Sequence, residues 1–274
     1  MTDQPVLFLD SGIGGIPYCR HFIARNPYEN IVYVADRKNF PYGNREKEEL
    51  ASILINLTEK LIKAVNPKIA VLVCNTATLA ALSELRERFQ KLPFVGTVPA
   101  IKPAALASQT GRIGVLGTEL TINEPYIREL AVMYGNGEIF GIGAPELVEF
   151  VETRINTASA EEKKTIVKDY LNRFRDAGID TLVLGCTHFL FLQEEFQREA
   201  APDITVFDSV AGITHRIESL LKENFPEENT SPDTHRKNSS HQNHLLLTGT
   251  DEPESSWITW AERLGFSLSL LEES

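Results

Sequence analysis

Short apolar runs rich in β-branched residues alternate along the chain with longer stretches whose apolar residues recur at helical spacing. The short runs predict strands over residues 6–10, 31–35, 69–74, 94–96, 113–117, 139–142, 181–185, 204–207 and 245–247. The longer stretches predict helices, among them residues 50–65, 78–89, 163–175 and 257–264. This alternation indicates an α/β fold with mostly parallel sheets flanked by helices, in which sites form at the carboxyl ends of strands.

An internal repeat divides this pattern into two halves. Two motifs recur in order: Val-Leu-Phe-Leu-Asp-Ser-Gly at 6–12 matches Ile-Gly-Val-Leu-Gly-Thr at 113–118, and Val-Leu-Val-Cys-Asn-Thr at 71–76 matches Leu-Val-Leu-Gly-Cys-Thr-His at 182–188. The motifs are similarly spaced, with 64 residues from Asp10 to Cys74 (74 − 10) and 68 from Thr118 to Cys186 (186 − 118). Self-similarity at regular spacing indicates a duplicated structural unit.

A third match sets the expected domain boundaries. A hydroxyl residue, Thr97 or Ser209, follows each cysteine by 23 residues (97 − 74 and 209 − 186), just after a short predicted strand. We therefore expect two similar lobes with the two cysteines across one shared cleft. The first lobe comprises residues 1–96 and 210–274, and the second comprises residues 97–209.

Residues 225–243 have no apolar period and are rich in Glu, Asn, Ser, Thr, Pro and His, which predicts a loose surface loop. The histidines of this region are His235, His241 and His244. Scattered histidines in a polar loop are far more often solvated than bound to a metal. We therefore expect no metal site.

Composition narrows the class of protein. The chain has 274 residues, a net charge of −11 and three cysteines without framework spacing. The length favours two domains, and the cysteines favour free thiols in a reducing compartment over disulfides. The start lacks a secretory signal, and no segment approaches the roughly 20 apolar residues of a membrane span. We expect a cytoplasmic protein with no membrane partner and, because of its negative charge, no nucleic acid as primary partner.

Two thiols are the strongest candidates for chemistry. Inverting the α-carbon of an amino acid requires a base and an acid on opposite faces of that carbon, and a thiol, whose ordinary pKa is about 8.5, suits both roles. Cys74 and Cys186 each follow an apolar strand and precede an expected helix start, where the helix dipole favours a thiolate. Either alone could be a buried core residue, but their matched positions favour catalysis. Cys19 has no counterpart, and for it we expect a core role.

Turn-rich loops follow the first two strands. Residues 10–15, Asp-Ser-Gly-Ile-Gly-Gly, lack the spacing and the lysine of nucleotide-binding loops. Asp10 and Ser11 are instead candidates to hold a substrate ammonium group and to act on the neighbouring thiol, although a plain turn with a helix cap uses the same residues. In the loop at 36–43, backbone amides and the hydroxyl of Tyr42 are candidates to meet a carboxylate.

Polar residues also flank both thiols. Asn75, Thr76 and Thr187 could bind the α-carboxylate and stabilise a carbanion-like transition state, or they could cap helices. His188 lies two residues after Cys186. It is a candidate proton relay, or a cation that favours the thiolate.

Six motifs together resemble those of the glutamate racemases over nearly the whole chain. They are Asp-Ser-Gly-Ile-Gly-Gly at 10–15, Pro-Tyr-Gly at 41–43, Cys-Asn-Thr at 74–76, Gly-Thr at 117–118, Pro-Glu-Leu-Val-Glu-Phe-Val-Glu at 145–152 and Leu-Val-Leu-Gly-Cys-Thr-His at 182–188. In this order and spacing they are highly specific. The chain departs from the family where Phe189 and Leu190 replace its Tyr-Pro, where Ala144 replaces the cysteine of its Cys-Pro, and in the longer loop at 225–243.

The resemblance implies a two-lobed α/β fold with pseudo-two-fold symmetry, a site in the cleft between the lobes, and a reaction without cofactor or metal that supplies D-glutamate for peptidoglycan. It implies that Cys74 and Cys186 transfer the protons, Cys74 at D-glutamate and Cys186 at L-glutamate, assisted by Asp10 and His188. The residues implied to line the substrate are Asp10, Ser11, Tyr42, Gly43, Asn75, Thr76, Thr187 and His188. In the second lobe Thr118 is a further candidate and Glu152 is a candidate to tune His188. A homodimer is the assembly considered.

Three other functions compete with this one. A racemase for aspartate or another acidic amino acid would use the same two thiols, because they act only at the α-carbon. A non-catalytic regulatory binding protein would be expected to lose one thiol or a substrate contact, yet both are present. A cysteine hydrolase would need Cys186 and His188 face to face, and residues two apart near a helix start do not generally meet.

Overall fold

The chain divides into two compact units. The computed structural model describes residues 4–135, 137–226 and 243–271. Residues 1–97 together with 210–274 form unit 1, and residues 98–209 form unit 2.

The residues left undescribed include most of the loop expected at 225–243. His235 and His241 lie outside the described residues, whereas His244 opens a strand. Within the described ranges no group of three or more His, Cys, Asp or Glu side chains is arranged to hold a metal ion. No described helix combines the length and the apolar character needed to cross a bilayer.

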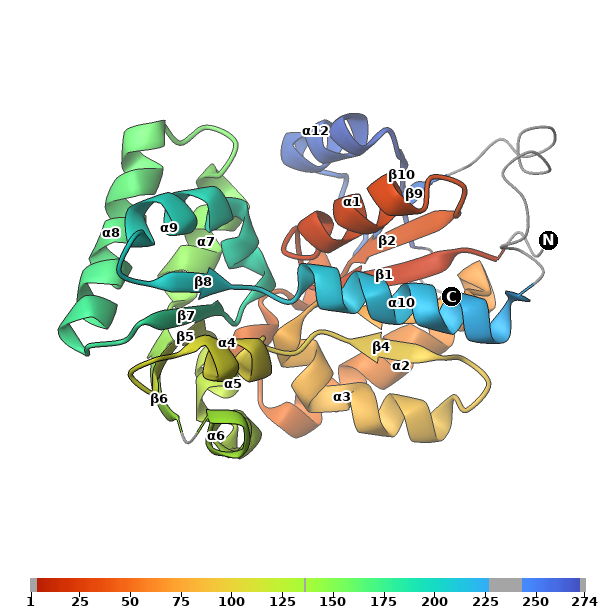
Figure 1. The fold of residues 1–274 in the computed structure, drawn as a ribbon. Helices are drawn as coiled ribbons and strands as arrows, with labels where there is room; N and C mark the ends of the chain where they lie inside the picture. The colour runs from red at the N-terminus through yellow and green to blue at the C-terminus, as the bar shows by residue number, and fades with distance from the viewer. Residues whose placement is uncertain (1–3, 136, 227–242, 272–274) are drawn as a thin grey trace. The chain divides into compact units, whose positions relative to one another are not determined.

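Unit 1 contains a six-stranded parallel sheet (Figure 1). In spatial order its strands are β10 (Ser267–Leu270), β9 (His244–Leu247), β2 (Ile31–Ala35), β1 (Val6–Asp10), β3 (Ile69–Leu72) and β4 (Phe94–Gly96). Every residue of β1, β2 and β3 is buried, as expected for central parallel strands covered on both faces. In the register of the sheet, Phe8 lies opposite both Tyr33 and Val71.

Helices cover both faces of this sheet. The α-helices in the described part of unit 1 are α1 (Ile16–Arg25), α2 (Lys47–Val65), α3 (Asn75–Arg88), α10 (Val210–Asn224) and α12 (Ser255–Leu264). Helix α2 buries Leu50, Leu54, Leu57 and Leu61, one stripe at helical spacing, in a core cluster with the strand residues Leu7, Leu9, Val32 and Val34. Phe8 points to the opposite face, since side chains alternate along a strand, and packs on Phe22 of α1 with ring centroids 5.5 Å apart.

Unit 2 contains a four-stranded parallel sheet. Its strands in spatial order are β6 (Glu138–Gly143), β5 (Arg112–Gly117), β7 (Thr181–Leu184) and β8 (Thr205–Phe207). Its α-helices are α4 (Ile101–Ala107), α5 (Glu119–Asn123), α6 (Pro125–Gly135), α7 (Pro145–Arg154), α8 (Ala160–Asp176) and α9 (Gln193–Ala200). Helix α8 begins with a full capping box between Ser159 and Glu162. The predicted α/β class, with mostly parallel sheets flanked by helices, is thus confirmed in both units.

The two sheets share a strand order. In unit 1 the first four strands lie in the order β2-β1-β3-β4, and in unit 2 the corresponding strands lie in the order β6-β5-β7-β8. The repeated motifs of the sequence therefore fall at equivalent points of the two units. The Asp10 and Thr118 motifs lie at the ends of the equivalent strands β1 and β5. Cys74 and Cys186 follow the equivalent strands β3 and β7.

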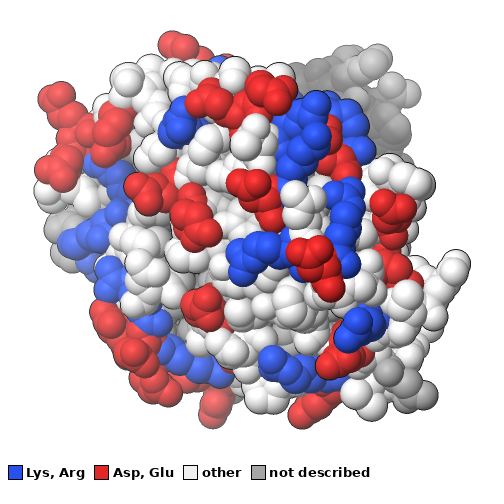
Figure 2. Space-filling model, turned by 90° about the vertical axis from the view of Figure 1, so that its left-hand side faces the viewer, with Lys and Arg blue, Asp and Glu red and all other residues white. Residues whose placement is uncertain are grey.

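Acidic and basic side chains are interspersed over the face drawn in Figure 2. Ion pairs on the surface of unit 2 join Lys168 to Glu199 at 3.5 Å and Arg175 to Asp203 at 3.9 Å. Surface ion pairs stabilise a fold by only about 0–1 kcal/mol each.

Candidate active site

Three neighbouring strands of unit 1 end next to predicted site residues. Strand β1 ends in Asp10, β2 leads into the loop that carries Tyr42, and β3 leads to Cys74. Because β2, β1 and β3 are adjacent and parallel, their carboxyl ends lie at one edge of the sheet. The residues of this unit 1 cluster are Asp10, Ser11, Tyr42, Gly43, Cys74, Asn75 and Thr76.

Cys74 occupies the N-cap position of α3. Its backbone is extended (φ −142°, ψ 120°), and its carbonyl oxygen accepts the first hydrogen bond of the helix from the Thr78 amide at 2.9 Å. The 14-residue helix directs the positive end of its dipole at this position. The side chain is buried, at 7% exposure, and Asn75 and Thr76 are buried in the first turn beside it. The Cys74 thiol therefore lies where the positive end of a helix dipole meets the end of β3.

Asp10 is fully buried, and its own loop holds it. Its Oδ1 atom accepts a hydrogen bond from the Gly12 amide at 2.7 Å. Its backbone carbonyl accepts another from the Asp36 amide at 2.8 Å. The carboxylate therefore has a defined orientation before any substrate binds.

The hydroxyl of Tyr42 has a partner within its own loop. It donates to Asp36 Oδ2 at 2.7 Å. Burial first, and then the charge and hydrogen bond of Asp36 and the charges of Cys74 and Asp10, raise the pKa of Tyr42 well above its ordinary value. The phenol of Tyr42 is therefore held in its neutral form next to Asp36, and the backbone of Tyr42 and Gly43 forms a 3-10 turn beside it.

Sequence reasoning missed Asp36, although its position directly after β2 was a usable signal. This buried carboxylate also accepts hydrogen bonds from Asn39 Nδ2 at 2.9 Å and Thr248 Oγ1 at 2.5 Å. It thereby joins the Tyr42 loop to the end of β9. Asp36 organises the loop from inside.

In unit 2 a hydrogen-bonded chain links a thiol, an imidazole and a carboxylate. Cys186 Sγ lies 3.7 Å from His188 Nδ1, and His188 Nε2 lies 2.6 Å from Glu152 Oε1 on α7. All three side chains are largely buried. The unit 2 cluster is this chain together with Thr187, which is buried beside it, and Thr118, which caps α5 by accepting from the Thr121 amide at 3.3 Å.

Local backbone geometry explains why Cys186 and His188 meet. The segment after Cys186 forms a 3-10 helix over Thr187–Leu192, followed by α9, where we expected one helix to start directly. Cys186 is the extended N-cap residue of this 3-10 helix (φ −133°, ψ 135°), and an N-cap side chain reaches back over the second and third residues of its helix, where His188 lies. Cys186 and His188 thus face each other, contrary to what we expected from their spacing.

The environment of His188 favours its charged form. Burial disfavours the imidazolium, but hydrogen bonds and negative charge from Cys186 and Glu152 outweigh burial and raise the pKa of His188 well above its ordinary value. A protonated His188 places a cation and a proton donor beside the Cys186 sulfur. Glu152 thus has the tuning contact that the resemblance implied for it.

Cys19 behaves as a core residue. It is fully buried on α1, and burial raises the pKa of its thiol. A neutral thiol enclosed in this way acts as a small apolar side chain.

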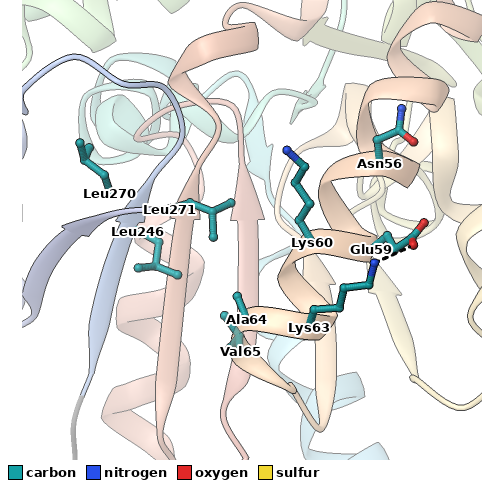
Figure 3. A pocket seen from close by; sticks show the side chains of 9 residues that line it. All are labelled: Asn56, Glu59, Lys60, Lys63, Ala64, Val65, Leu246, Leu270 and Leu271. Atoms are coloured by element: carbon teal, nitrogen blue, oxygen red, sulfur yellow. Dashed lines mark hydrogen bonds and ion pairs between the residues drawn. The ribbon is translucent and has the colours of Figure 1, made fainter. Parts of the chain in front are cut away.

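Unit 1 also contains two cavities that neither of its described cysteines lines. The larger, about 870 Å³, opens between α2 and the β9–β10 edge of the sheet (Figure 3). Its lining residues are Asn56, Glu59, Lys60, Lys63, Ala64, Val65, Leu246, Leu270 and Leu271. A smaller one of about 210 Å³ reaches Asp36 and Thr248. Neither contains a thiol, so we give them no part in the chemistry.

The chain matches known racemases over most of its length. The Asp/Glu/Hydantoin racemase family matches residues 24–216. The glutamate racemase of Sphingopyxis alaskensis is 40% identical over 221 residues, 80% of this chain and 82% of that protein. The glutamate racemase of Shewanella oneidensis is 37% identical over 250 residues, 90% of this chain and 85% of that protein.

Solved structures agree with the sequence matches. The crystal structure of Escherichia coli glutamate racemase, in complex with L-glutamate and the activator UDP-MurNAc-Ala, superposes with a TM-score of 0.80 at 29% identity and covers 97% of each chain. The Bacillus anthracis isoform RacE1 superposes with a TM-score of 0.78 at 28% identity. The contact between Cys186 and His188 would also suit a hydrolase, but the matched proteins are isomerases. With strands, cysteines and relatives in agreement, this chain belongs to the glutamate racemases, amino-acid-racemising enzymes of the Asp/Glu/Hydantoin racemase family.

Proposed function

We propose that the enzyme interconverts L- and D-glutamate without a cofactor, by a two-base mechanism in which Cys74 and Cys186 exchange protons with opposite faces of the α-carbon. One observation carries the proposal. The two units have the same strand order, and each has a buried cysteine two residues after the equivalent strand, β3 in unit 1 and β7 in unit 2. A pair of equivalent thiols is what a symmetric inversion needs, because each enantiomer must find both a base and an acid.

In the direction from L- to D-glutamate, the Cys186 thiolate removes the α-proton and the Cys74 thiol donates a proton to the opposite face. In the reverse direction the roles exchange. Asp10 assists proton transfer at Cys74. His188, held by Glu152, supplies positive charge to the Cys186 thiolate.

Polar groups near both thiols would hold the substrate. We assign the ammonium group to Asp10 and Ser11, and the carboxylates to hydroxyl, amide and backbone donors, which also stabilise charge that develops at the α-carbon. These donors are the backbone amides of Tyr42 and Gly43 and the side chains of Asn75, Thr76, Thr118 and Thr187.

Substrate choice is tested by incubating the purified enzyme with L-glutamate or L-aspartate, without added cofactor, and following optical rotation. We expect the rotation of L-glutamate to decay to zero and that of L-aspartate to persist. Faster decay with L-aspartate would replace the proposed substrate by the alternative acidic amino acid.

The reaction should need neither a metal nor pyridoxal phosphate, because the two thiols supply the acid and the base. Turnover is expected to stay unchanged after dialysis against EDTA and after treatment with hydroxylamine, measured by the same optical assay. Activity lost in either treatment and restored by a divalent metal or by pyridoxal phosphate would contradict this.

Asp10→Asn is expected to lower kcat by about 100-fold, a typical contribution of a positioned acid or base. The melting temperature should change little, because the amide keeps the shape of the side chain and its hydrogen bond from the Gly12 amide. Asp203→Asn makes the same chemical change at an exposed position and should keep full activity. An Asp10→Asn enzyme with the normal kcat would remove Asp10 from the mechanism.

We further propose that the D-glutamate formed supplies peptidoglycan synthesis. We place the reaction in the cytoplasm, the reducing compartment in which its three free cysteines remain thiols. Expression of the chain should relieve the D-glutamate requirement of a bacterium that lacks its own racemase. For its assembly we propose a homodimer, which sedimentation velocity of the purified enzyme would test.

A further inference from the structure

Tyr33 places a phenol beneath the loop that carries Asp10. It is the middle residue of β2, lies opposite Phe8 of β1 and Leu245 of β9, and is completely buried. A buried tyrosine retains a polar hydroxyl that needs hydrogen-bond partners. Here both partners belong to the loop that follows β1.

The hydroxyl of Tyr33 bridges the two ends of the glycine-rich turn. It donates to the carbonyl oxygen of Gly12 at 2.9 Å and accepts from the amide of Gly15 at 3.1 Å. The Gly12 amide in turn donates to Asp10 Oδ1 at 2.7 Å. Gly12 is therefore held by Tyr33 through its carbonyl and holds Asp10 through its amide.

The same turn presses against the strand that leads to Cys74. A Cβ atom on Gly15 would lie 2.3 Å from Val73 Cγ2 and 3.0 Å from the Tyr33 hydroxyl oxygen, so only glycine fits. Val73 immediately precedes Cys74. The position of the turn is thus fixed between Tyr33 on β2 and Val73, which follows β3 and precedes the thiol.

We propose that Tyr33 is a positioning residue for racemisation, because its hydroxyl fixes the turn that orients the Asp10 carboxylate for proton transfer at Cys74. This inference rests on the proposed function, in which Asp10 assists Cys74. Tyr33 touches neither thiol nor substrate in this scheme, and its effect passes through Gly12.

Tyr33→Phe tests the inference, since it removes the hydroxyl and keeps the ring in the core. We expect kcat to fall about 10- to 100-fold, as misplaced catalytic groups typically cause, with a smaller change in KM. In an Asp10→Asn background the same substitution should have little further effect, because a residue that acts through Asp10 loses its influence with it. Ser108→Ala is the control. It removes a different hydroxyl, which lies between α4 and β5 of unit 2 and donates to Asp180 Oδ1 at 2.6 Å, and it should lower stability without lowering kcat.

Isotope effects separate positioning from a general loss of folded enzyme. If proton transfer at Cys74 is slowed, the primary deuterium effect should rise with Cα-deuterated D-glutamate and fall with Cα-deuterated L-glutamate. A structural defect would reduce kcat for both enantiomers with unchanged isotope effects, and this would overturn the inference.

The remaining outcomes are also informative. A normal kcat in Tyr33→Phe beside a slow Asp10→Asn would overturn the role of Tyr33 and leave the proposed function intact. A normal kcat in Asp10→Asn would instead overturn the role of Asp10 on which the inference rests. The opposite split of isotope effects would support positioning by Tyr33 and reverse the assignment of the thiols to the two enantiomers.

Discussion

Replacing either Cys74 or Cys186 by alanine is expected to abolish measurable racemisation of glutamate in both directions. Each enantiomer requires one thiolate to remove the proton and the other thiol to return one, so neither cysteine can cover for the loss of its counterpart. The rate should fall by about 10⁴-fold or more, at the upper end of what a positioned acid or base contributes. Initial rates from both pure enantiomers, followed by circular dichroism, measure the effect.

Cys19→Ala is the matched control. It makes the same chemical change at the third buried cysteine, which lies in the core on α1. All three variants should fold, with a loss of stability on the order of 1 kcal/mol, because alanine removes a single sulfur atom. Only Cys19→Ala should retain the wild-type turnover number. A Cys74→Ala enzyme that racemises glutamate at the normal rate would end the two-thiol proposal.

Heavy water adds a test within the wild-type enzyme. Early in the reaction, deuterium should enter the α-position of the newly formed enantiomer, while recovered substrate should stay largely protiated if the abstracting thiol returns its proton before exchange. A single-base enzyme would label both enantiomers from the start. Proton NMR of the two separated enantiomers distinguishes these results.

The central strands were predictable because buried parallel strands are continuous runs of apolar residues. Residues 6–10 and 31–35 are continuous apolar runs, and the structure places β1 and β2 over the same residues. Strand β3 ends at Leu72, two residues before the predicted end, because Val73 and Cys74 already lead into α3. Strand β10 was missed, since Ser267–Leu270 alternates exposed and half-buried residues at the edge of the sheet and lacks a long apolar run.

The site was predictable only as far as single residues carry a signal. Cysteines at matched positions are visible in a repeat, but the partners of a buried side chain depend on register between strands. Tyr33 reads as an ordinary apolar strand residue until the register places its hydroxyl below Gly12. The contact of Cys186 with His188 likewise depends on the extended backbone of Cys186 at the N-cap, which the pattern of apolar residues does not specify.

Glu152→Gln is expected to slow racemisation by about 100-fold at pH 8, within the usual range for a group that supports acid–base catalysis, and by less at pH 6. Glutamine keeps an oxygen to accept from His188 Nε2 but removes the negative charge. Cys186 and Glu152 together raise the pKa of His188 well above 6.5 in spite of burial. Without the Glu152 charge that pKa falls, and the imidazolium beside Cys186 is lost at lower pH than in the wild type. Lowering the pH restores it.

The effect of Glu152→Gln on stability should depend on pH in the opposite sense to its effect on kcat. A histidine whose pKa is raised by folding stabilises the protein fully below its unfolded pKa of about 6.5, and this contribution is lost as pH rises through the folded pKa. The difference in melting temperature between wild type and Glu152→Gln should therefore be largest near pH 6 and shrink toward pH 8 and above. Over the same interval the difference in kcat should grow.

Glu149→Gln supplies the control, since it removes the same charge from an exposed position of the same helix, α7. It should change neither kcat nor its pH dependence. His188→Asn should reproduce the activity loss of Glu152→Gln at pH 8 but remain slow at pH 6, because it has no proton to regain. Equal losses for Glu152→Gln at both pH values would show that the carboxylate only supports the fold, and that charge on His188 does not assist the Cys186 thiol.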